Sequence, residues 1–573
     1  MIIPQIKVNY KVLFICGLAG ILLMVIGIYA GFYLAPSIVN NKILETKVLR
    51  EGTEQWSNFM KVPFPFQFKV YLFTVQNVEA VQAGAKPLVQ EQGPYVYQLT
   101  RWKDQVAWNH STDEISYHEY EEYKFDAESS GGLSEQDVVT VLNPAFLVTP
   151  PSNTYLLLQK DCNLNSLQSF LYTAEMDPAT RDFLPLIDES LDAIFGSYNS
   201  PFFTNITVRE FLFEGLRICR NGCSDDGFVA KMACNKIKER MADTKQMRAD
   251  GDDILYASFH YVSAAKVLQK YVQFKLSLGV LGSLKDGPFI RWSIAEDSRD
   301  TLYILFVYTQ RNNSHQGYIT VAAGQKNATI GEITQLDHQT TLNVWSKDQF
   351  ECNRVSGLTT VFPTGVGFDT TFQSFSEDIC RTVSFEYSRR DMVGLIKGNR
   401  YEALKSTFNT SKNACFCTDH TRNFDGDVGC LYDGVLDLTT CQGAPVLVSF
   451  PHLLYADSRY LDKVAGLNPD PSKHAMFVTL EPTSGTPLKV AKRVQFNLLL
   501  RSVRNITSLE AVGKSIVPMF WIEESTTLPE KYQDVIKNKI YRTLLILDIV
   551  RYAVLALAIT VIVCCIVLFI YAT

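Results

Sequence analysis

The sequence has little excess of either charge. Among its 573 residues, 54 lysines and arginines stand against 60 acidic residues, which gives a formal net charge of −6. Such a chain lacks the basic surface that binds a nucleic-acid backbone, so we expect no nucleic-acid partner. The chain also lacks a Pro/Gly/Ser-rich linker or an internal repeat that would divide it. With 47% hydrophobic residues it can bury a sizeable core, and we predict one large folded unit with an inserted subdomain.

Catalytic and metal-binding motifs are absent as well. The chain contains no G-x-S-x-G elbow, no P-loop and no H-E-x-x-H; His118-Glu119 has no second histidine four residues on. Asp425-Gly426-Asp427 lacks the acidic ladder of an EF-hand loop, so we interpret it as a solvated turn. Because no nucleophile–base constellation is found, we predict that the protein is not an enzyme and has neither a cofactor nor a metal site.

Long uncharged runs occur only at the two ends of the chain, Val12 to Ala35 and Tyr552 to Ala572. About twenty apolar residues cross a bilayer as a helix. The first run is longer than the apolar core of a signal peptide, so we interpret it as a retained anchor. The sequence therefore predicts a short N-terminal segment (1–11), transmembrane helices at 12–35 and 552–572, and a large segment, 36–551, on one side of the membrane.

Basic residues do not decide on which side the large segment lies, because they occur both before and after the first span. Two other features indicate the outside of the cell. Ten cysteines, an even number, lie between the spans, and so do six Asn-x-Ser/Thr sequons. The predicted glycosylation sites are Asn109, Asn205, Asn312, Asn327, Asn409 and Asn505. We therefore predict a double-pass protein of the plasma membrane with both termini in the cytoplasm.

Six of the thirteen cysteines lie within ninety residues, at positions 352, 380, 415, 417, 430 and 441. A zinc site would favour paired C-x-x-C knuckles, whereas this segment has a C-x-C at Cys415 and Cys417 and only His420 nearby. Outside the cytosol such spacing favours disulfides. Four further cysteines predict two more bridges, for which three pairings are possible: Cys162, Cys219, Cys223 and Cys234.

The hydrophobic pattern predicts an α+β fold, in which a large antiparallel sheet or barrel carries a helical cap. Alternating aromatic and β-branched residues predict strands at 66–73, 95–99, 115–125, 303–308, 318–321, 494–500 and 516–522. Helical periodicity dominates from about residue 163 to residue 250. Within that cap Thr207 and Glu210 form a candidate capping box. Further helices are predicted over 43–60 and, with Asn77 as the cap, up to Ala83.

Several strings of residues, in order along the chain, resemble the class B scavenger receptor family. They are Gln92-Gly93-Pro94-Tyr95, Cys415-Phe416-Cys417, Pro451-His452-Leu453-Leu454, Gly466-Leu467-Asn468-Pro469 with His474, and Phe520-Trp521-Ile522-Glu523-Glu524. The run from Glu79 to Pro87, and the cysteines around Leu212 to Cys234, look most like the insect sensory neuron membrane proteins. The resemblance covers nearly the whole segment between the anchors.

This resemblance implies a β-barrel-like ectodomain with an apical helical bundle. It implies three disulfides, Cys352–Cys415, Cys380–Cys441 and Cys417–Cys430. It also implies an apolar tunnel that leads from the apical helices towards the membrane. The ligand entrance would be formed by apolar residues of the cap: Phe170, Leu171, Phe202 and Phe203.

The resemblance further implies a lipid-binding receptor or co-receptor of chemosensory neurons. It would capture fatty-chain odorants or pheromones and pass them through the tunnel to membrane lipid or to an odorant-receptor channel. Moving about fifteen methylenes out of water is worth roughly 12 kcal/mol, so an apolar conduit suits such a cargo. Two alternatives stay open: a general lipid or lipoprotein uptake receptor, and a lysosomal sorting receptor that binds a protein through its cap. Residues 182–208 contain no basic residue, which argues against a receptor that takes up anionic lipoprotein particles.

Overall fold

The structure is a computed structural model, and it describes residues 10–143, 203–214, 314–325, 330–346, 350–411, 414–417, 423–424, 429–442 and 446–572, with a few shorter pieces between residues 185 and 256. Most of the predicted cap, and the strand predicted at 303–308, therefore lie outside the described residues.

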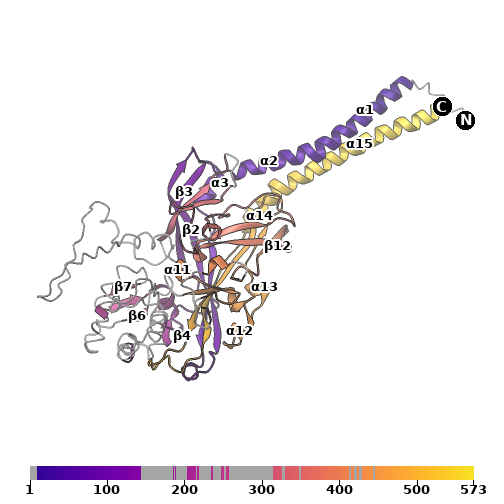
Figure 1. The fold of residues 1–573 in the computed structure, drawn as a ribbon. Coiled ribbons are helices and arrows are strands. Elements are labelled where there is room, and N and C mark those ends of the chain that lie inside the picture. Colours follow the sequence, from indigo (N-terminus) through magenta and orange to yellow (C-terminus); the bar gives the residue numbers. More distant parts are fainter. Residues whose placement is uncertain are drawn as a thin grey trace.

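Two long apolar helices form the ends of the described chain. The first comprises α1 (Tyr10–Tyr29), a π-helical turn (Ala30–Leu34) and α2 (Ala35–Lys47). The second comprises α14 (Glu530–Ile536), a π-helical turn (Lys537–Tyr541) and α15 (Arg542–Ala572). Both are long and apolar enough to cross a membrane. They lie side by side, with the two termini together at the end remote from the sheet (Figure 1). A Cβ on Gly20 would lie 2.9 Å from Ile562, so the helices are in close contact.

A thirteen-stranded sheet forms the body of the protein, in the order β10-β9-β3-β2-β1-β18-β17-β16-β13-β12-β11, with β15 on β17 and β14 on β15. All of these pairs are antiparallel. The strands are β1 (Phe66–Val75), β2 (Val89–Asn109), β3 (Glu114–Phe125), β9 (Ser314–Ala322), β10 (Ile333–Leu336), β11 (Phe372–Ser376), β12 (Arg381–Val393), β13 (Ile396–Ala403), β14 (Val435–Asp437), β15 (Leu447–Ser449), β16 (Phe477–Leu480), β17 (Pro487–Leu500) and β18 (Ser515–Thr527).

The two edge strands of this sheet are joined through Gly357 and Leu358. The amide of Ile333 in β10 donates to the carbonyl of Gly357 over 2.9 Å, and Leu358 forms bridges with Glu332 and with Ser374 of β11. The segment satisfies backbone groups on both edges, which would otherwise be left open. The sheet is therefore nearly closed, as the predicted α+β fold with a barrel-like sheet requires.

The pairing of β1 with β18 brings the two ends of the chain together. Gln67 lies opposite Ser525, and Leu72 lies opposite Phe520. The strand that follows the first apolar helix is therefore hydrogen-bonded to the strand that precedes the second. This places both apolar helices at the same end of the sheet.

Short helices occupy the loops. They are α3 (Glu54–Met60), α4 (Val78–Gln82), α10 (Phe350–Asn353), α11 (Thr439–Gln442), α12 (Ser458–Leu461) and α13 (Pro471–His474), with 3₁₀ turns at Glu377–Ile379, Ala414–Phe416 and Pro451–Leu453. Two predictions near the N-terminus need correction. The helix predicted over 43–60 is broken between α2 and α3, where Gly52 has a φ of +78°. Asn77 precedes α4 but does not cap it; its side chain bonds Lys86 and Leu88 instead.

The segment predicted as a helical cap, about residues 163–250, also contains strands, which the sequence pattern did not predict. β4 (Val138–Leu142) pairs with β5 (Phe203–Thr207), and β6 (Leu216–Ile218), β8 (Asp253–Tyr256) and β7 (Met247–Asp250) form a small sheet. β-branched residues in β4 and β5 outweigh the helical period there. The capping box is confirmed: the Glu210 amide donates to the Thr207 hydroxyl, and the Glu210 carboxylate accepts from the Thr207 amide, before the π-helical turn Glu210–Glu214.

Gly466 holds the loop after β15 against the start of β2, and it provides a test of this packing. Its φ is +96°, and a Cβ at this position would overlap the carbonyl of Val89. We expect Gly466→Ala to cost more than about 2 kcal/mol of stability, because strain and overlap add. The measurement is thermal unfolding of the full chain in nanodiscs. Gly52→Ala is the control, since Gly52 also has a positive φ but nothing within 4 Å. Equal losses in the two variants would contradict the assigned packing.

Candidate functional site

The inside of the sheet is the candidate functional site. Side chains alternate along each strand, and on β3 the outer residues Glu122 and Lys124 are exposed while Tyr123 and Ile115 are buried on the inner face. Cross-strand registers carry this inner face round the sheet. Its apolar members include Phe68, Val70, Leu72, Tyr97, Leu99, Val494, Phe496, Phe520 and Ile522, all buried.

Aromatic rings from the segment that follows β5 reach this inner face. The rings of Phe211 and Phe520 lie 5.6 Å apart, those of Phe496 and Phe520 lie 5.0 Å apart, and those of Phe213 and Tyr97 lie 5.2 Å apart. Aromatic contacts at these distances bury large apolar areas. The described part of the insertion is therefore continuous with an apolar interior.

A network of charged residues also lies on the inner face. Arg101 on β2 pairs with Glu121 on β3 over 2.7 Å and with Glu524 on β18. Lys103 pairs with Glu119 over 2.8 Å and lies above the ring of Phe59. Burial disfavours the charged forms, but the opposite charges outweigh it: the pKa of Glu119 is lowered and that of Arg101 is raised. Glu119 and Arg101 therefore stay charged at neutral pH.

A second inner ion pair crosses the interior. Lys492 on β17 pairs with Asp378 in the turn between β11 and β12. In the order of the sheet, β16, β13 and β12 lie between these two elements. Because Lys492 lies on the inner face and three strands separate β17 from this turn, the ion pair reaches across the space that the sheet encloses. The interior thus combines an apolar wall with fixed charges.

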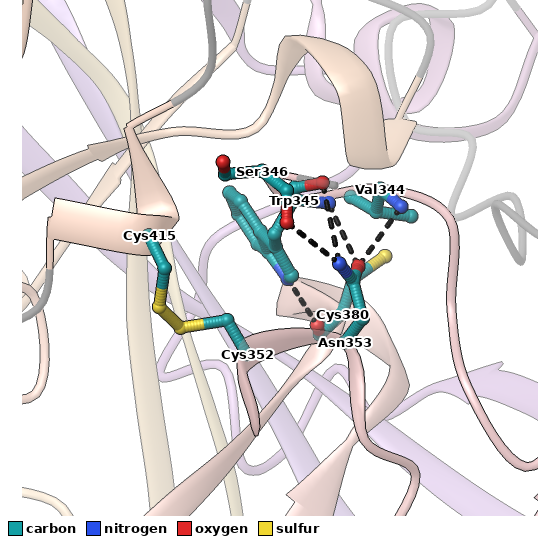
Figure 2. Close-up of a disulfide and its surroundings, with 7 residues drawn as sticks. All are labelled: Val344, Trp345, Ser346, Cys352, Asn353, Cys380 and Cys415. Atoms are coloured by element: carbon teal, nitrogen blue, oxygen red, sulfur yellow. Dashed lines mark hydrogen bonds between the residues drawn. A yellow bond between two sulfur atoms is a disulfide. The ribbon is translucent and has the colours of Figure 1, made fainter. Parts of the chain in front are cut away.

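The cysteine-rich segment packs against β11 and β12, and the structure contains three disulfides in it: Cys352–Cys415, Cys380–Cys441 and Cys417–Cys430. Figure 2 shows the first of them beside Trp345 and Asn353. The Asn353 side chain accepts from the amides of Val344 and Trp345 and donates to the carbonyl of Trp345. The Trp345 indole N–H donates to the carbonyl of Cys380 over 2.7 Å. A buried polar network thereby joins two of the disulfides.

The other predicted site residues are placed only in part. Cys234 is disulfide-bonded. The other three cysteines of this group, Cys162, Cys219 and Cys223, lie outside the described residues. Asn109, Asn205 and Asn505 are exposed and Asn409 is half-buried, whereas Asn312 and Asn327 lie outside the described residues. Of the predicted ligand entrance, Phe203 is described; it is buried in β5 opposite Leu142. The remaining three residues, Phe170, Leu171 and Phe202, lie outside the described residues.

Three of the strings that carry the family resemblance, those containing His452, His474 and Trp521, meet around Glu91 on the outer face of the sheet. His452 donates from Nε2 to Glu91 over 2.6 Å, and the Trp521 indole donates to the same carboxylate over 2.7 Å. The rings of His452 and His474 are stacked 4.3 Å apart. Backbone amides of Asn468 and Asp470 donate to Nδ1 of His452 and His474 respectively. Both Nδ1 atoms must be unprotonated to accept these bonds. Through the bonds to Glu91 and the stacked rings, the cluster holds the loop after β15 against β2 and β18.

The inner charges were missed in the sequence. Arg101 and Glu524 are separated by 423 positions, so nothing local marks them as partners. The available signal was the alternation of residues along the strand. Leu99, Arg101 and Lys103 are each separated by two positions, counting from the buried Tyr97. In a strand, that spacing assigns all four residues to one face.

Comparison with known proteins decides the family. Residues 18–569 match the CD36 family. The chain belongs to the CD36 family. Sensory neuron membrane protein 2 of Drosophila melanogaster is 31% identical over 96% of each chain. Sensory neuron membrane protein 2 of Anopheles gambiae is 30% identical, over 94% of this chain and 89% of that protein. Sensory neuron membrane protein 1 of Bombyx mori is 28% identical, over 90% and 83%.

Family membership and structure agree on the general character of the molecule. This member of the CD36 family is a membrane receptor of the scavenger class B kind, with an apolar helix near each terminus that could cross the bilayer. The predicted family and fold class are confirmed. Within the described residues, no group of three His, Cys, Asp or Glu side chains could hold a metal ion.

The stacked histidines predict loss of stability in acid. Burial first, and then the nearby His452, lower the pKa of His474 from 6.5 to about 4, against the opposing effect of Glu91 and Asp470. The unfolded chain therefore binds a proton between these pH values that the folded chain does not. Stability contributed by His474 is complete above pH 6.5 and falls as the pH drops towards about 4.

This prediction is measured as the unfolding temperature of the full chain in nanodiscs from neutral pH down to about pH 4. We expect a smaller fall for His474→Asn, because asparagine keeps an acceptor for the Asp470 amide but does not titrate. Glu91, whose pKa is lowered by the bonds from His452 and Trp521 despite burial, still contributes to the remaining fall. Identical pH profiles for the two proteins would show that His474 does not contribute.

Proposed function

We propose that this CD36-family protein is a cell-surface receptor or co-receptor of chemosensory neurons that binds fatty-chain odorants or pheromones inside its sheet. The observation that carries the proposal is the nearly closed sheet with an apolar, aromatic inner face. Relatives named sensory neuron membrane proteins, matched over most of the chain, support the sensory setting. The ligand would pass along the interior to membrane lipid or to an odorant-receptor channel.

The pairing of β1 with β18 supports the delivery step. Because both apolar helices leave the same end of the sheet, the interior lies directly above the bilayer that the helices would cross. A fatty chain leaving the sheet at that end has the shortest path through water, which lowers the cost of transfer. Delivery to membrane lipid, or to a partner in the same membrane, needs no further carrier.

We also propose the orientation. Segment 36–551, with its disulfides and its six sequons, would be extracellular, with spans at 12–35 and 552–572 and both termini in the cytoplasm of a double-pass plasma-membrane protein. Three disulfides within the cysteine-rich segment support an oxidising compartment. Exposed asparagines at Asn109, Asn205 and Asn505 are available for glycans. The helices predicted between residues 163 and 250 would form the ligand entrance.

Narrowing the interior tests this function. Val494 is completely buried on the inner face, whereas Val138 on β4 is 61% exposed. We expect Val494→Trp to weaken binding of hexadecyl acetate to the full chain in nanodiscs by at least about tenfold, since the indole takes the volume of several methylenes. Val138→Trp, the same exchange on an exposed position, serves as the control and leaves binding unchanged.

Folding and function are separated in this experiment by the unfolding temperature of the empty proteins. Val494→Phe replaces the tryptophan variant if the latter does not fold. A folded inner-face variant that binds hexadecyl acetate as tightly as the control would contradict an internal site. Absence of binding to the unmodified protein, with a protein ligand bound to the insertion instead, would favour a sorting receptor.

A further inference from the structure

Arg381, the first residue of β12, differs from the other cations of the inner face. Arg101, Lys103 and Lys492 each have a carboxylate partner on another element. Arg381 faces the same side: it shares the alternation of Val383 and Phe385, both buried, while the intervening Thr382 and Ser384 lie on the outer face. In the described part of the chain, no ion pair includes it.

Among the described residues, two nitrogen atoms of the Arg381 guanidinium are buried without an acceptor. Only 7% of the residue is exposed, and its Nε and Nη1 atoms have no hydrogen-bond partner. The group lies over the ring of Phe416, 3.7 Å from the centroid, in the cysteine-rich segment. An aromatic face attracts a cation but does not satisfy its N–H groups. The Nε–H and Nη1–H donors are therefore buried without hydrogen-bond acceptors in the described part of the chain.

The electrostatics of the site lead to the same conclusion. Burial lowers the pKa of Arg381 to about 10, and no carboxylate of the described residues opposes this. Glu377 and Asp378 precede it in the chain, but Asp378 is engaged by Lys492. A buried cation with no anion is costly for a fold to keep. The cost is removed if a ligand supplies the anion.

We propose that Arg381 binds the carboxylate of a long-chain fatty acid whose alkyl chain lies along the apolar inner face. The unpartnered Nε–H and Nη1–H groups can each donate a charge-assisted hydrogen bond to a carboxylate oxygen. Val383, Phe385, Val494 and Phe496 provide apolar surface on the same face for the chain. The inference rests on the proposed internal lipid site and assigns to it one anchoring residue and one head-group class.

The experiment compares palmitate with methyl palmitate, which has the same acyl chain but no charge. Each compound competes with a diazirine-bearing palmitate that crosslinks to the full chain in nanodiscs. For the unmodified protein we expect palmitate to compete more strongly than its ester. In Arg381→Gln we expect this preference to fall by at least about tenfold, because a charged pair of hydrogen bonds is lost while the chain contacts remain. Arg381→Lys retains part of the preference.

Arg390 on the same strand provides the matched control. Its guanidinium also lies over a phenylalanine ring, that of Phe368, but the residue is exposed. Arg390→Gln is expected to leave the head-group preference unchanged. The empty Arg381→Gln protein is expected to unfold at the same or a higher temperature than the unmodified protein, because an unpaired buried charge has been removed.

Each outcome decides a different point. Unchanged preference in Arg381→Gln, with both compounds still binding, would overturn the anchoring role while leaving the internal site intact. A large loss of stability in the empty variant with the preference unchanged would make Arg381 a purely structural residue held by Phe416. Failure of every compound to compete in the unmodified protein would overturn the proposed lipid function together with this inference.

Discussion

The antiparallel pairing of β1 with β18 is the constraint on which the rest of the structure depends. It joins the strand after the first apolar helix to the strand before the second, residue by residue from Gln67–Ser525 to Leu72–Phe520. The chain between them must leave and return to the same end of the sheet. Since both helices would be fixed in the bilayer, the pairing also fixes the direction in which the interior faces the membrane. Side-by-side packing of the helices follows from it.

Closure of the sheet gives it two faces with different physical tasks. The outer face near Trp521 is covered by the loop after β15, which the Glu91–His452–His474 cluster fastens in place. The inner face encloses aromatic residues and ion pairs instead. Buried ion pairs return little stability for their desolvation. In the function that we propose, these charges would contribute to the choice of ligand rather than to stability.

Much of the fold could be predicted from the sequence because it depends on local pattern. Alternation in Phe66 to Phe73 and in Ile516 to Ile522 marks β1 and β18, and two uncharged runs mark the apolar helices. β5 was missed because its five residues, Phe203 to Thr207, lie within a segment of helical period, and their partner β4 is more than sixty residues away. The alternation along β2 could have assigned Arg101 to the inner face, but its partner could not be predicted, since Arg101 and Glu524 become neighbours only when β1 pairs with strands on both sides.

The central claim is that a fatty chain occupies the inside of the sheet. The most direct measurement is the site of covalent labelling by a diazirine-bearing fatty chain in the full-length protein in nanodiscs, mapped by peptide mass spectrometry. The account predicts labels on β17 and β18 at inner-face positions such as Val494, Phe496 and Phe520. Labels confined to the two apolar helices and to the outer face of the sheet, with none on the inner face, would contradict it.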